Sequence, residues 1–251
     1  MIGIFDSGVG GLSVFREIRK LLPEERYIYY SDNAHCPYGE KAREYVIGRA
    51  REITKFLISE GAGIIVIACN TATAAAIATL REEFPVKFIG MEPAVKPAAL
   101  STRTGVVGVL ATAGTLKADK YLNIREKWAE GVRIVEHVGQ GFVELVESGC
   151  TSGQKAEDTV MESIRPLIEE GADRLVLGCT HYPFLSGPIS AAASKLAPER
   201  DVRIIDPAPA VARHLHEIMK QEGLITAEGF GITLHSSGDD TILKETYNKI
   251  I

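Results

Sequence analysis

Short apolar runs alternate along most of this chain with longer amphipathic stretches, and that alternation restricts the possible folds more than any other feature of the sequence. The short runs are apolar at successive positions, which is typical of strands that are buried on both faces of a sheet. Strands are predicted at residues 2–5, 27–30, 64–68, 87–90, 106–110, 133–137, 175–178 and 202–205.

The longer stretches carry apolar residues at the 3.6-residue spacing of an amphipathic helix. Helices are predicted at residues 12–22, 42–59, 71–84, 116–128, 156–170 and 208–220. Buried strands that are separated by helices form mostly parallel sheets with helices on each side. The predicted fold class is therefore α/β with mostly parallel sheets.

The same order of elements occurs twice in the chain. Residues 2–12 resemble residues 107–116, because each segment is a strand, a turn of small residues with a hydroxyl, and the start of a helix. Residues 65–71 resemble residues 175–181, and each of these segments contains a cysteine. A repeat of this kind indicates an internal duplication. We therefore expect two pseudo-symmetric α/β lobes, with equivalent strand ends opposite one another across a cleft that holds the active site.

Two proline-rich segments, residues 90–97 and 205–211, are the predicted crossings between the lobes. They are the densest clusters of proline in the chain. The first lobe would then hold residues 1–93 and 207–251, and the second would hold residues 94–206.

The composition is that of an ordinary soluble globular protein, with 251 residues, 45% hydrophobic residues and a formal net charge of −5. The positive charges form no basic stripe, so no nucleic-acid partner is expected. The longest apolar run, residues 64–69, is far shorter than the ~20 residues of a membrane span. The N-terminal segment lacks the basic start and the cleavage site of a signal peptide. We therefore expect a cytoplasmic protein with no membrane partner.

Four cysteines in a chain of this length do not indicate a disulfide framework, and no Cys-x-x-Cys pair is found beside Cys69 or Cys179. Cys36 and Cys150 lie in polar segments, whereas Cys69 and Cys179 each stand where a strongly apolar run ends. A cysteine in that position can be a small buried core residue. Because Cys69 also precedes a predicted helix, and a helix N-terminus lowers the pKa of a thiol, it is a candidate for an activated thiol.

The helix that follows Cys69 begins near Asn70 and Thr71, which are both favourable N-cap residue types. Its free backbone N–H groups could hold the carboxylate of a substrate.

Cys179 is followed two positions later by His181. In an extended chain, residues two positions apart point to the same side, so the imidazole could relay a proton for the thiol. The alternative is a core cysteine beside a histidine that caps a loop. A zinc site is not expected, because no second pair of ligands has suitable spacing.

Two loops have both a functional and a structural interpretation. The glycine-rich turn at residues 6–11 could cradle an anion with free backbone N–H groups. It could also be a tight turn in which Asp6 or Ser7 caps the following helix. The loop at residues 31–40 could be a substrate lid or a surface turn capped by Asp32.

Several motifs, taken together and in order, resemble those of the glutamate racemase family. They are the segments at residues 6–11, 37–39, 69–73 and 178–183, and the likeness covers most of the chain. The resemblance implies a two-lobed aspartate/glutamate racemase fold and the interconversion of L-glutamate and D-glutamate for peptidoglycan synthesis. It also implies a bacterial cytoplasmic enzyme, usually a homodimer, that requires neither pyridoxal phosphate nor a metal ion.

The resemblance further implies roles for individual residues. Asp6 would assist Cys69, and His181 would assist Cys179. The first cysteine would deprotonate D-glutamate and the second would deprotonate L-glutamate. The residues implied to contact the substrate are polar or lie in loops: Asp6, Ser7, Pro37, Tyr38, Gly39, Asn70, Thr71, Thr112, Thr115, Thr180 and His181.

Glu147 matches the family's acidic residue that supports the second cysteine. The sequence departs from the commoner pattern just before it, because residues 139–141 are Gly-Gln-Gly where Cys-Pro is expected. Both Glu144 and Glu147 are therefore candidate supporting acids, and the alignment of residues 146–149 favours Glu147. The alternative is that the two acids form a solvated helix face at spacing i, i+3.

Inversion of an α-carbon requires that a proton leave one face and that another proton reach the opposite face. Two thiols can do this, because a reference thiol pKa of about 8.5 permits both thiol and thiolate near neutrality. A racemase for aspartate or another amino acid is an alternative, since one methylene changes binding by only ~1–3 kcal/mol. A second alternative is a non-catalytic anion-binding protein built on the turn at residues 6–11, which gives Cys179 no special role.

Overall fold

The computed structural model describes residues 1–250, which divide into two compact units. The first unit comprises Met1–Met91 together with the chain from Ala208 onward, and the second comprises Glu92–Pro207. The sequence predicts that the chain passes between the lobes after residues 93 and 206. In the structure it passes from the first unit to the second after residue 91 and returns after residue 207.

The first unit contains a five-stranded parallel sheet. Its strand order is β4 (Lys87–Ile89), β3 (Ile64–Ile67), β1 (Ile2–Asp6), β2 (Arg26–Ser31) and β9 (Gly231–Ser236). Its helices are α1 (Leu12–Leu21), α2 (Arg43–Ser59), α3 (Asn70–Glu83), α10 (Ala208–Gln221) and α11 (Thr241–Ile250), with single 3-10 turns η1 (Asn33–His35) and η2 (Tyr38–Glu40).

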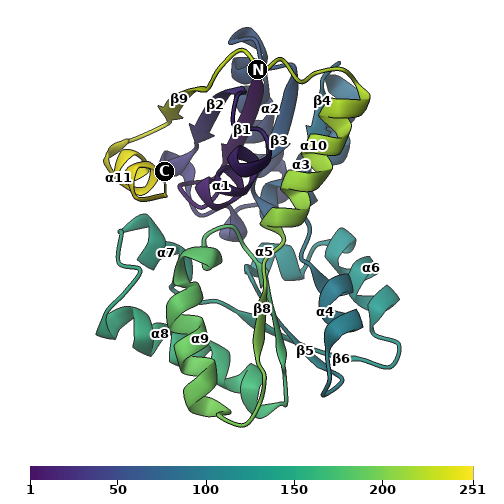
Figure 1. The fold of residues 1–251 in the computed structure, drawn as a ribbon, viewed down its shortest axis with the longest axis vertical. Coiled ribbons are helices and arrows are strands. Elements are labelled where there is room, and N and C mark those ends of the chain that lie inside the picture. Colours follow the sequence, from purple (N-terminus) through teal and green to yellow (C-terminus); the bar gives the residue numbers. More distant parts are fainter. Residues whose placement is uncertain (251) are drawn as a thin grey trace. The chain divides into compact units, whose positions relative to one another are not determined.

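The two faces of this sheet are covered by different helices because side chains alternate along each strand. Phe5 and Ile28 lie on the face that α2 and α3 cover, in one buried apolar cluster. Tyr27, one position before Ile28, meets Phe15 of α1 in an edge-to-face contact with ring centroids 5.1 Å apart. Helix α1 packs in turn against α10 (Figure 1).

The second unit contains a four-stranded parallel sheet. Its strand order is β6 (Arg133–Val138), β5 (Val106–Ala111), β7 (Arg174–Gly178) and β8 (Arg203–Ile205). Its helices are α4 (Val95–Ser101), α5 (Ala113–Leu116), α6 (Asp119–Trp128), α7 (Phe142–Glu147), α8 (Gln154–Glu169) and α9 (Ser186–Leu196), with the 3-10 turn η3 (Tyr182–Leu185). Helices α4 and α6 pack together on one side of the sheet, and α8 and α9 pack together on the other (Figure 1).

The two sheets share one topology. The order β4-β3-β1-β2 in the first unit corresponds to β8-β7-β5-β6 in the second, and β9 extends only the first sheet beyond β2. The predicted α/β class with parallel sheets is confirmed, and the internal repeat seen in the sequence appears as a repeated strand order. Cys69 therefore follows β3, which lies beside β1, and Cys179 follows the equivalent strand β7, which lies beside β5.

All eight predicted strands are present among residues 1–250, but five elements of this part of the chain are missing from the prediction: β9, α4, α7, α9 and α11. Strand β9 is a partly exposed edge strand, so it lacks the continuous apolar run of a buried strand. Helix α4 carries Pro97 at its third position, where the first turn of a helix tolerates proline, so the segment resembles a proline-rich crossing. The helix predicted at residues 116–128 is interrupted between α5 and α6.

Within residues 1–250, no helix combines the length and the apolar character that crossing a bilayer would require.

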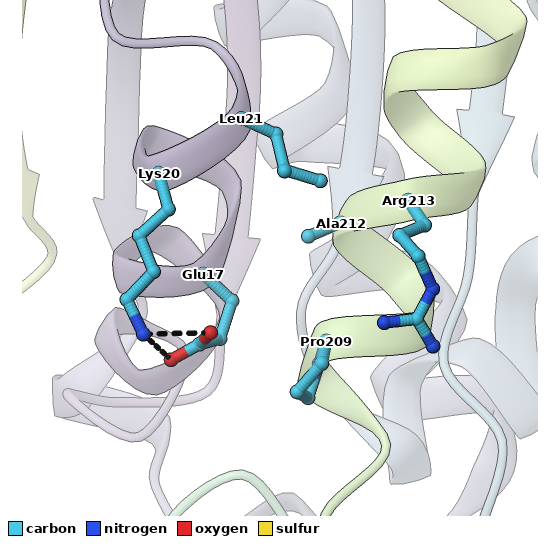
Figure 2. Close-up of a pocket in the computed structure, with 6 residues that line it drawn as sticks. All are labelled: Glu17, Lys20, Leu21, Pro209, Ala212 and Arg213. Atoms are coloured by element: carbon cyan, nitrogen blue, oxygen red, sulfur yellow. Dashed lines mark hydrogen bonds and ion pairs between the residues drawn. The ribbon is translucent and has the colours of Figure 1, made fainter.

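A shallow pocket lies between α1 and α10 (Figure 2). Its volume of about 140 Å³ is smaller than the ~300–1,000 Å³ of typical ligand sites. It is lined by Glu17, Lys20, Leu21, Pro209, Ala212 and Arg213, and Glu17 pairs with Lys20 at 2.7 Å. None of the predicted site residues lines this pocket.

Candidate active site

Asp6 is the last residue of β1 and its side chain is fully buried. One carboxylate oxygen accepts the backbone N–H of Ser7 at 2.7 Å, and the other accepts that of Gly11 at 2.6 Å. The alternative interpretation, in which Asp6 or Ser7 is the N-cap residue of α1, is wrong in its choice of residue, because the N-cap is Gly11, which makes no side-chain cap hydrogen bond. Asp6 instead closes the whole turn, and it uses two of the N–H groups that a bound anion would need.

The glycine-rich turn packs directly against the neighbouring strands. A Cβ atom on Gly11 would lie 2.7 Å from the hydroxyl of Tyr29 and 2.8 Å from Cβ of Asp6. Both distances are shorter than real Cβ contacts, so the position requires glycine. Tyr29 is buried and donates its hydroxyl to the carbonyl of Gly8 at 2.9 Å, which fixes the turn from β2.

Cys69 is the N-cap residue of α3, and its Sγ accepts the backbone N–H of Ala72 at 3.4 Å. Asn70 and Thr71 are therefore not N-cap residues, because the helix already begins at Asn70. The thiol is 5% exposed. A helix N-terminus favours negative charge, so the N–H of Ala72 is a favourable contact for a thiolate at this position.

Ser7 connects Cys69 to Asp6. The thiol of Cys69 lies 3.9 Å from the hydroxyl of Ser7, and that hydroxyl lies 3.4 Å from Oδ1 of Asp6. A hydroxyl can donate one hydrogen bond and accept another at the same time. The hydroxyl of Ser7 can therefore link the protonation of the Cys69 thiol to the carboxylate of Asp6.

Asn70 is 3% exposed, and among residues 1–250 neither its amide nitrogen nor its amide oxygen has a hydrogen-bond partner. Such buried polar atoms are rare in native proteins, because leaving one unpaired costs about 1–3 kcal/mol. An amide held in this state beside Cys69 is suited to receive the polar groups of a ligand.

The loop after β2 is held by an ion pair between buried Asp32 and partly buried Arg49. Arg49 of α2 donates to both carboxylate oxygens of Asp32, at 2.7 and 2.9 Å, and the hydroxyl of Tyr38 donates to Asp32 at 2.5 Å. Burial alone would raise the pKa of Asp32, but the hydrogen bonds from Arg49 and Tyr38 lower it below its ordinary value. Burial, reinforced by the charge of Asp32, raises the pKa of Tyr38.

Asp32 is fully buried and its side chain makes no cap hydrogen bond, so the interpretation of a surface turn capped by Asp32 is wrong. The sequence contained no signal for Arg49, since it lies 17 positions away on a helix with other charged residues. The pair anchors Tyr38, which leads directly into the predicted substrate-binding position Gly39.

In the second unit, Cys179 follows β7 and is 8% exposed. Its Sγ lies 3.7 Å from Nδ1 of His181, and Nε2 of the same imidazole lies 2.5 Å from Oε1 of Glu147. The backbone of His181 is helical rather than extended, so a tight turn into η3 creates the contact that the alternation of an extended chain had predicted. The three side chains form a chain of two contacts in which the carboxylate of Glu147 can orient the imidazole of His181 toward the thiol of Cys179.

Helix α7 presents its two acids differently. Glu144 is exposed, whereas Glu147 is partly buried and contacts His181. The helix begins after Gly141, which has a φ of 78° and so adopts a conformation that glycine accepts without strain. The Gly-Gln-Gly departure therefore supplies the backbone freedom with which α7 starts.

Thr112 and Thr115 occupy the turn after β5, which is equivalent to the turn that follows β1. Thr112 is the N-cap residue of α5, and its hydroxyl accepts the backbone N–H of Thr115 at 3.3 Å. The two hydroxyl oxygens lie 3.0 Å apart. Thr180, beside Cys179, is buried. The turn after β5 is thus held by the hydroxyls of Thr112 and Thr115, whereas the equivalent turn after β1 is held by the carboxylate of Asp6.

Comparison with known proteins identifies the family. The model of the Asp/Glu/Hydantoin racemase family matches residues 2–215. The chain belongs to this family. The glutamate racemase of Stutzerimonas stutzeri is 47% identical over 95% of this chain and 89% of its own length. The resemblance to glutamate racemases that the sequence motifs indicated is therefore confirmed.

Solved structures agree with this assignment. The glutamate racemase of Francisella tularensis, solved with D-glutamate, has a TM-score of 0.82 and 28% identity, and the match covers 99% of this chain and 92% of that one. The Escherichia coli glutamate racemase, solved with L-glutamate and an activator, has a TM-score of 0.80 and 32% identity, with 94% and 97% covered. This chain has the same α/β fold as these enzymes.

Proposed function

We propose that the protein is a glutamate racemase in which Cys69 and Cys179 are the two acid/base groups. The observation that carries the proposal is that both thiols follow equivalent strands and that each is linked to a carboxylate. Cys69 reaches Asp6 through Ser7, and Cys179 reaches Glu147 through His181. Each compact unit thus supplies one supported thiol, and we propose that the two units are the two lobes of the enzyme.

The reaction needs one thiolate and one thiol at the start. The thiolate removes the α-proton from one face of glutamate, and the electron pair of the broken C–H bond remains on the α-carbon. The opposite thiol then protonates that carbon from the other face, so the configuration inverts. The thiol and thiolate have now exchanged states, which makes the enzyme ready for the reverse reaction. No group other than the two cysteines has to carry the proton.

Residues around the thiols are suited to hold the substrate. We assign the α-carboxylate and amine to Ser7, Asn70, Thr71 and Thr180, because fixed donors stabilise the charge that develops during deprotonation. The residues assigned to the remainder of the substrate are Asp6, Pro37, Tyr38, Gly39, Thr112, Thr115 and His181.

The choice of glutamate over aspartate is supported by the relatives rather than by any one residue. A pocket distinguishes two acids that differ by one methylene by only ~1–3 kcal/mol, so small differences in shape decide the preference. The anion-binding alternative is less well supported, because Asp6 already occupies N–H groups of the glycine-rich turn.

We further propose that the enzyme works without pyridoxal phosphate or metal, since two thiols can supply both proton-transfer groups. It would supply D-glutamate for peptidoglycan in the bacterial cytoplasm, as a homodimer. Racemisation that is unchanged by EDTA and by hydroxylamine would support independence from metal and from pyridoxal phosphate. Sedimentation equilibrium measures whether the protein is a homodimer.

The deciding experiment incubates each glutamate enantiomer with the protein in heavy water and follows optical rotation and deuterium at the α-carbon. The expected result is complete racemisation from either enantiomer, with deuterium entering the product as it forms. Inversion of aspartate without inversion of glutamate would overturn the substrate assignment, and no inversion of either would overturn the racemase itself.

A further inference from the structure

We propose that Tyr182 is a positioning residue for proton transfer at Cys179, because it fixes the start of the helix that brings Glu147 to His181. The inference rests on the proposed racemase function. Tyr182 follows His181 directly, so two consecutive residues of one turn contact the two ends of α7, Tyr182 at Phe142 and His181 at Glu147.

Tyr182 is fully buried against the segment that leads into α7. Its hydroxyl donates to the carbonyl of Gly139 at 3.3 Å, and its ring meets the ring of Phe142 edge to face at 4.9 Å. A Cβ atom on Gly139 would lie 2.7 Å from the hydroxyl and from the ring. The absence of a side chain at position 139 therefore allows Tyr182 to lie where it does.

The carbonyl of Gly139 also accepts the backbone N–H of Phe142 at 3.3 Å. This carbonyl thus joins the turn that starts α7 to the phenol of Tyr182. Burial raises the pKa of Tyr182 well above its ordinary value, so the phenol is protonated near neutral pH and can donate its hydrogen bond.

Helix α7 has only six residues and ends at Glu147. It is about 9 Å long at 1.5 Å per residue, so a shift at its start moves its end as part of one rigid body. Glu147 meets Nε2 of His181 at 2.5 Å, and that imidazole contacts the thiol of Cys179. Displacements of about 1 Å in such an arrangement can reduce a reaction rate by about 100-fold.

The test compares Tyr182→Phe with Tyr121→Phe. Tyr121 is a matched control, because it is also buried in the second unit, packs in the apolar cluster of α4 and α6, and donates its hydroxyl to Glu136 at 2.8 Å. Each variant loses one buried phenol hydroxyl and retains its ring. Thermal unfolding shows whether both remain folded.

The two enantiomers of glutamate have equal free energy, so any variant changes kcat/KM equally in both directions. A side-specific effect is visible in the primary deuterium isotope effects of the two α-deuterated enantiomers. We expect Tyr182→Phe to lower kcat/KM about 10-fold. Its isotope effect should rise for L-glutamate, which the family resemblance assigns to Cys179, and fall for D-glutamate. Tyr121→Phe should change neither isotope effect.

A double-mutant cycle with Glu147→Gln provides a second measurement. If Tyr182 acts through Glu147, Tyr182→Phe should add little to the loss that Glu147→Gln causes alone. Gly139→Ala, which displaces the ring but keeps the hydroxyl, should shift the isotope effects in the same direction.

The inference is overturned if the folded Tyr182→Phe enzyme keeps the isotope effects of the unmodified protein, or if its loss multiplies fully with that of Glu147→Gln. Either outcome would leave the racemase function intact, because that function is measured on the unmodified protein.

Discussion

The two cysteines follow equivalent strands, yet they are supported by different kinds of groups. Cys69 is the N-cap residue of a 14-residue helix, and its sulfur accepts a backbone N–H from Ala72. Cys179 precedes a single 3-10 turn, so no long helix begins at its thiol. Its support comes from the imidazole of His181 and the carboxylate of Glu147.

This difference shows what a duplicated fold preserves. The repeated strand order places a thiol after the same strand in each unit, because the backbone topology is shared. The contacts of the two thiols are not shared: the sulfur of Cys69 accepts a main-chain N–H and lies near the hydroxyl of Ser7, whereas the sulfur of Cys179 lies near the imidazole of His181. Side-chain substitutions can therefore remove the support of Cys179, whereas the backbone contribution to Cys69 remains after any of them.

The largest effect is expected from removal of either thiol, which is the feature that the two sites share. Cys69→Ser and Cys179→Ser should each reduce racemisation by about 10⁴-fold, at the upper end of what a general acid or base contributes. Polarimetry with both enantiomers measures the loss. Cys150→Ser is the matched control, since Cys150 is exposed, and it should be fully active. Full activity of either serine variant at Cys69 or Cys179 would contradict the two-thiol mechanism.

The next effect tests the side-chain support of Cys179. Glu147→Gln should lower kcat by about 100-fold, because the imidazole loses the carboxylate that orients it. Glu144→Gln changes an exposed acid on the same helix and should leave kcat unchanged. Steady-state kinetics of the two variants show which acid supports Cys179. An equal loss of kcat in both would mean that the negative charge of the helix is important rather than the contact with His181.

A smaller effect concerns the first unit. Asn70→Ala should raise KM about 10-fold, the size expected from one hydrogen bond to a charged group. Because the amide has no partner among residues 1–250, its loss should not lower the free energy of unfolding. Thr54→Ala, which also removes a buried unpaired group, is the control for KM. A fall in stability without a change in KM would show that Asn70 serves the fold instead.

The smallest effect on catalysis is expected from loss of the ion pair between Arg49 and Asp32 in the first unit. Its loss should mainly lower the stability of the fold. Asp32→Asn should lower the free energy of unfolding at pH 7 by about 2 kcal/mol, because the charge-assisted hydrogen bonds between Asp32 and partly exposed Arg49 are weakened. The pKa of Asp32 is lowered in the folded state, so its contribution is complete above its unfolded pKa and is lost as the pH falls through the folded value. Urea denaturation at several pH values should show the two proteins converging below about pH 4. A difference that is independent of pH would exclude a charged Asp32 as the cause.

Much of the fold follows from local patterns. Strands β1, β3 and β7 are buried at every residue and read as apolar runs, because burial on both faces of a sheet leaves that mark in the sequence. The missed strand β9 is an exposed edge, and the missed helix α4 contains Pro97 in its first turn, so neither carries the pattern of its class. Short elements between longer ones depend on tertiary packing that no local pattern reports.

The candidate site divides in the same way. Cys69 and Cys179 are visible because each ends an apolar run, and the spacing of His181 from Cys179 is local. The pairing of Arg49 with Asp32 and of Tyr182 with Gly139 joins residues 17 and 43 positions apart, so no local pattern reveals it.

The sequence by itself determined the α/β class, the repeated order of elements and the two thiols, because periodicity and strand ends are properties of neighbouring residues. The tertiary structure decided the contacts of each thiol between candidates that the sequence left open. It made Cys69 rather than Asn70 the cap of α3, and it brought Glu147 rather than Glu144 to His181. Such choices depend on where a helix begins and how it packs, and the free energies involved are set by contacts between residues distant in the chain.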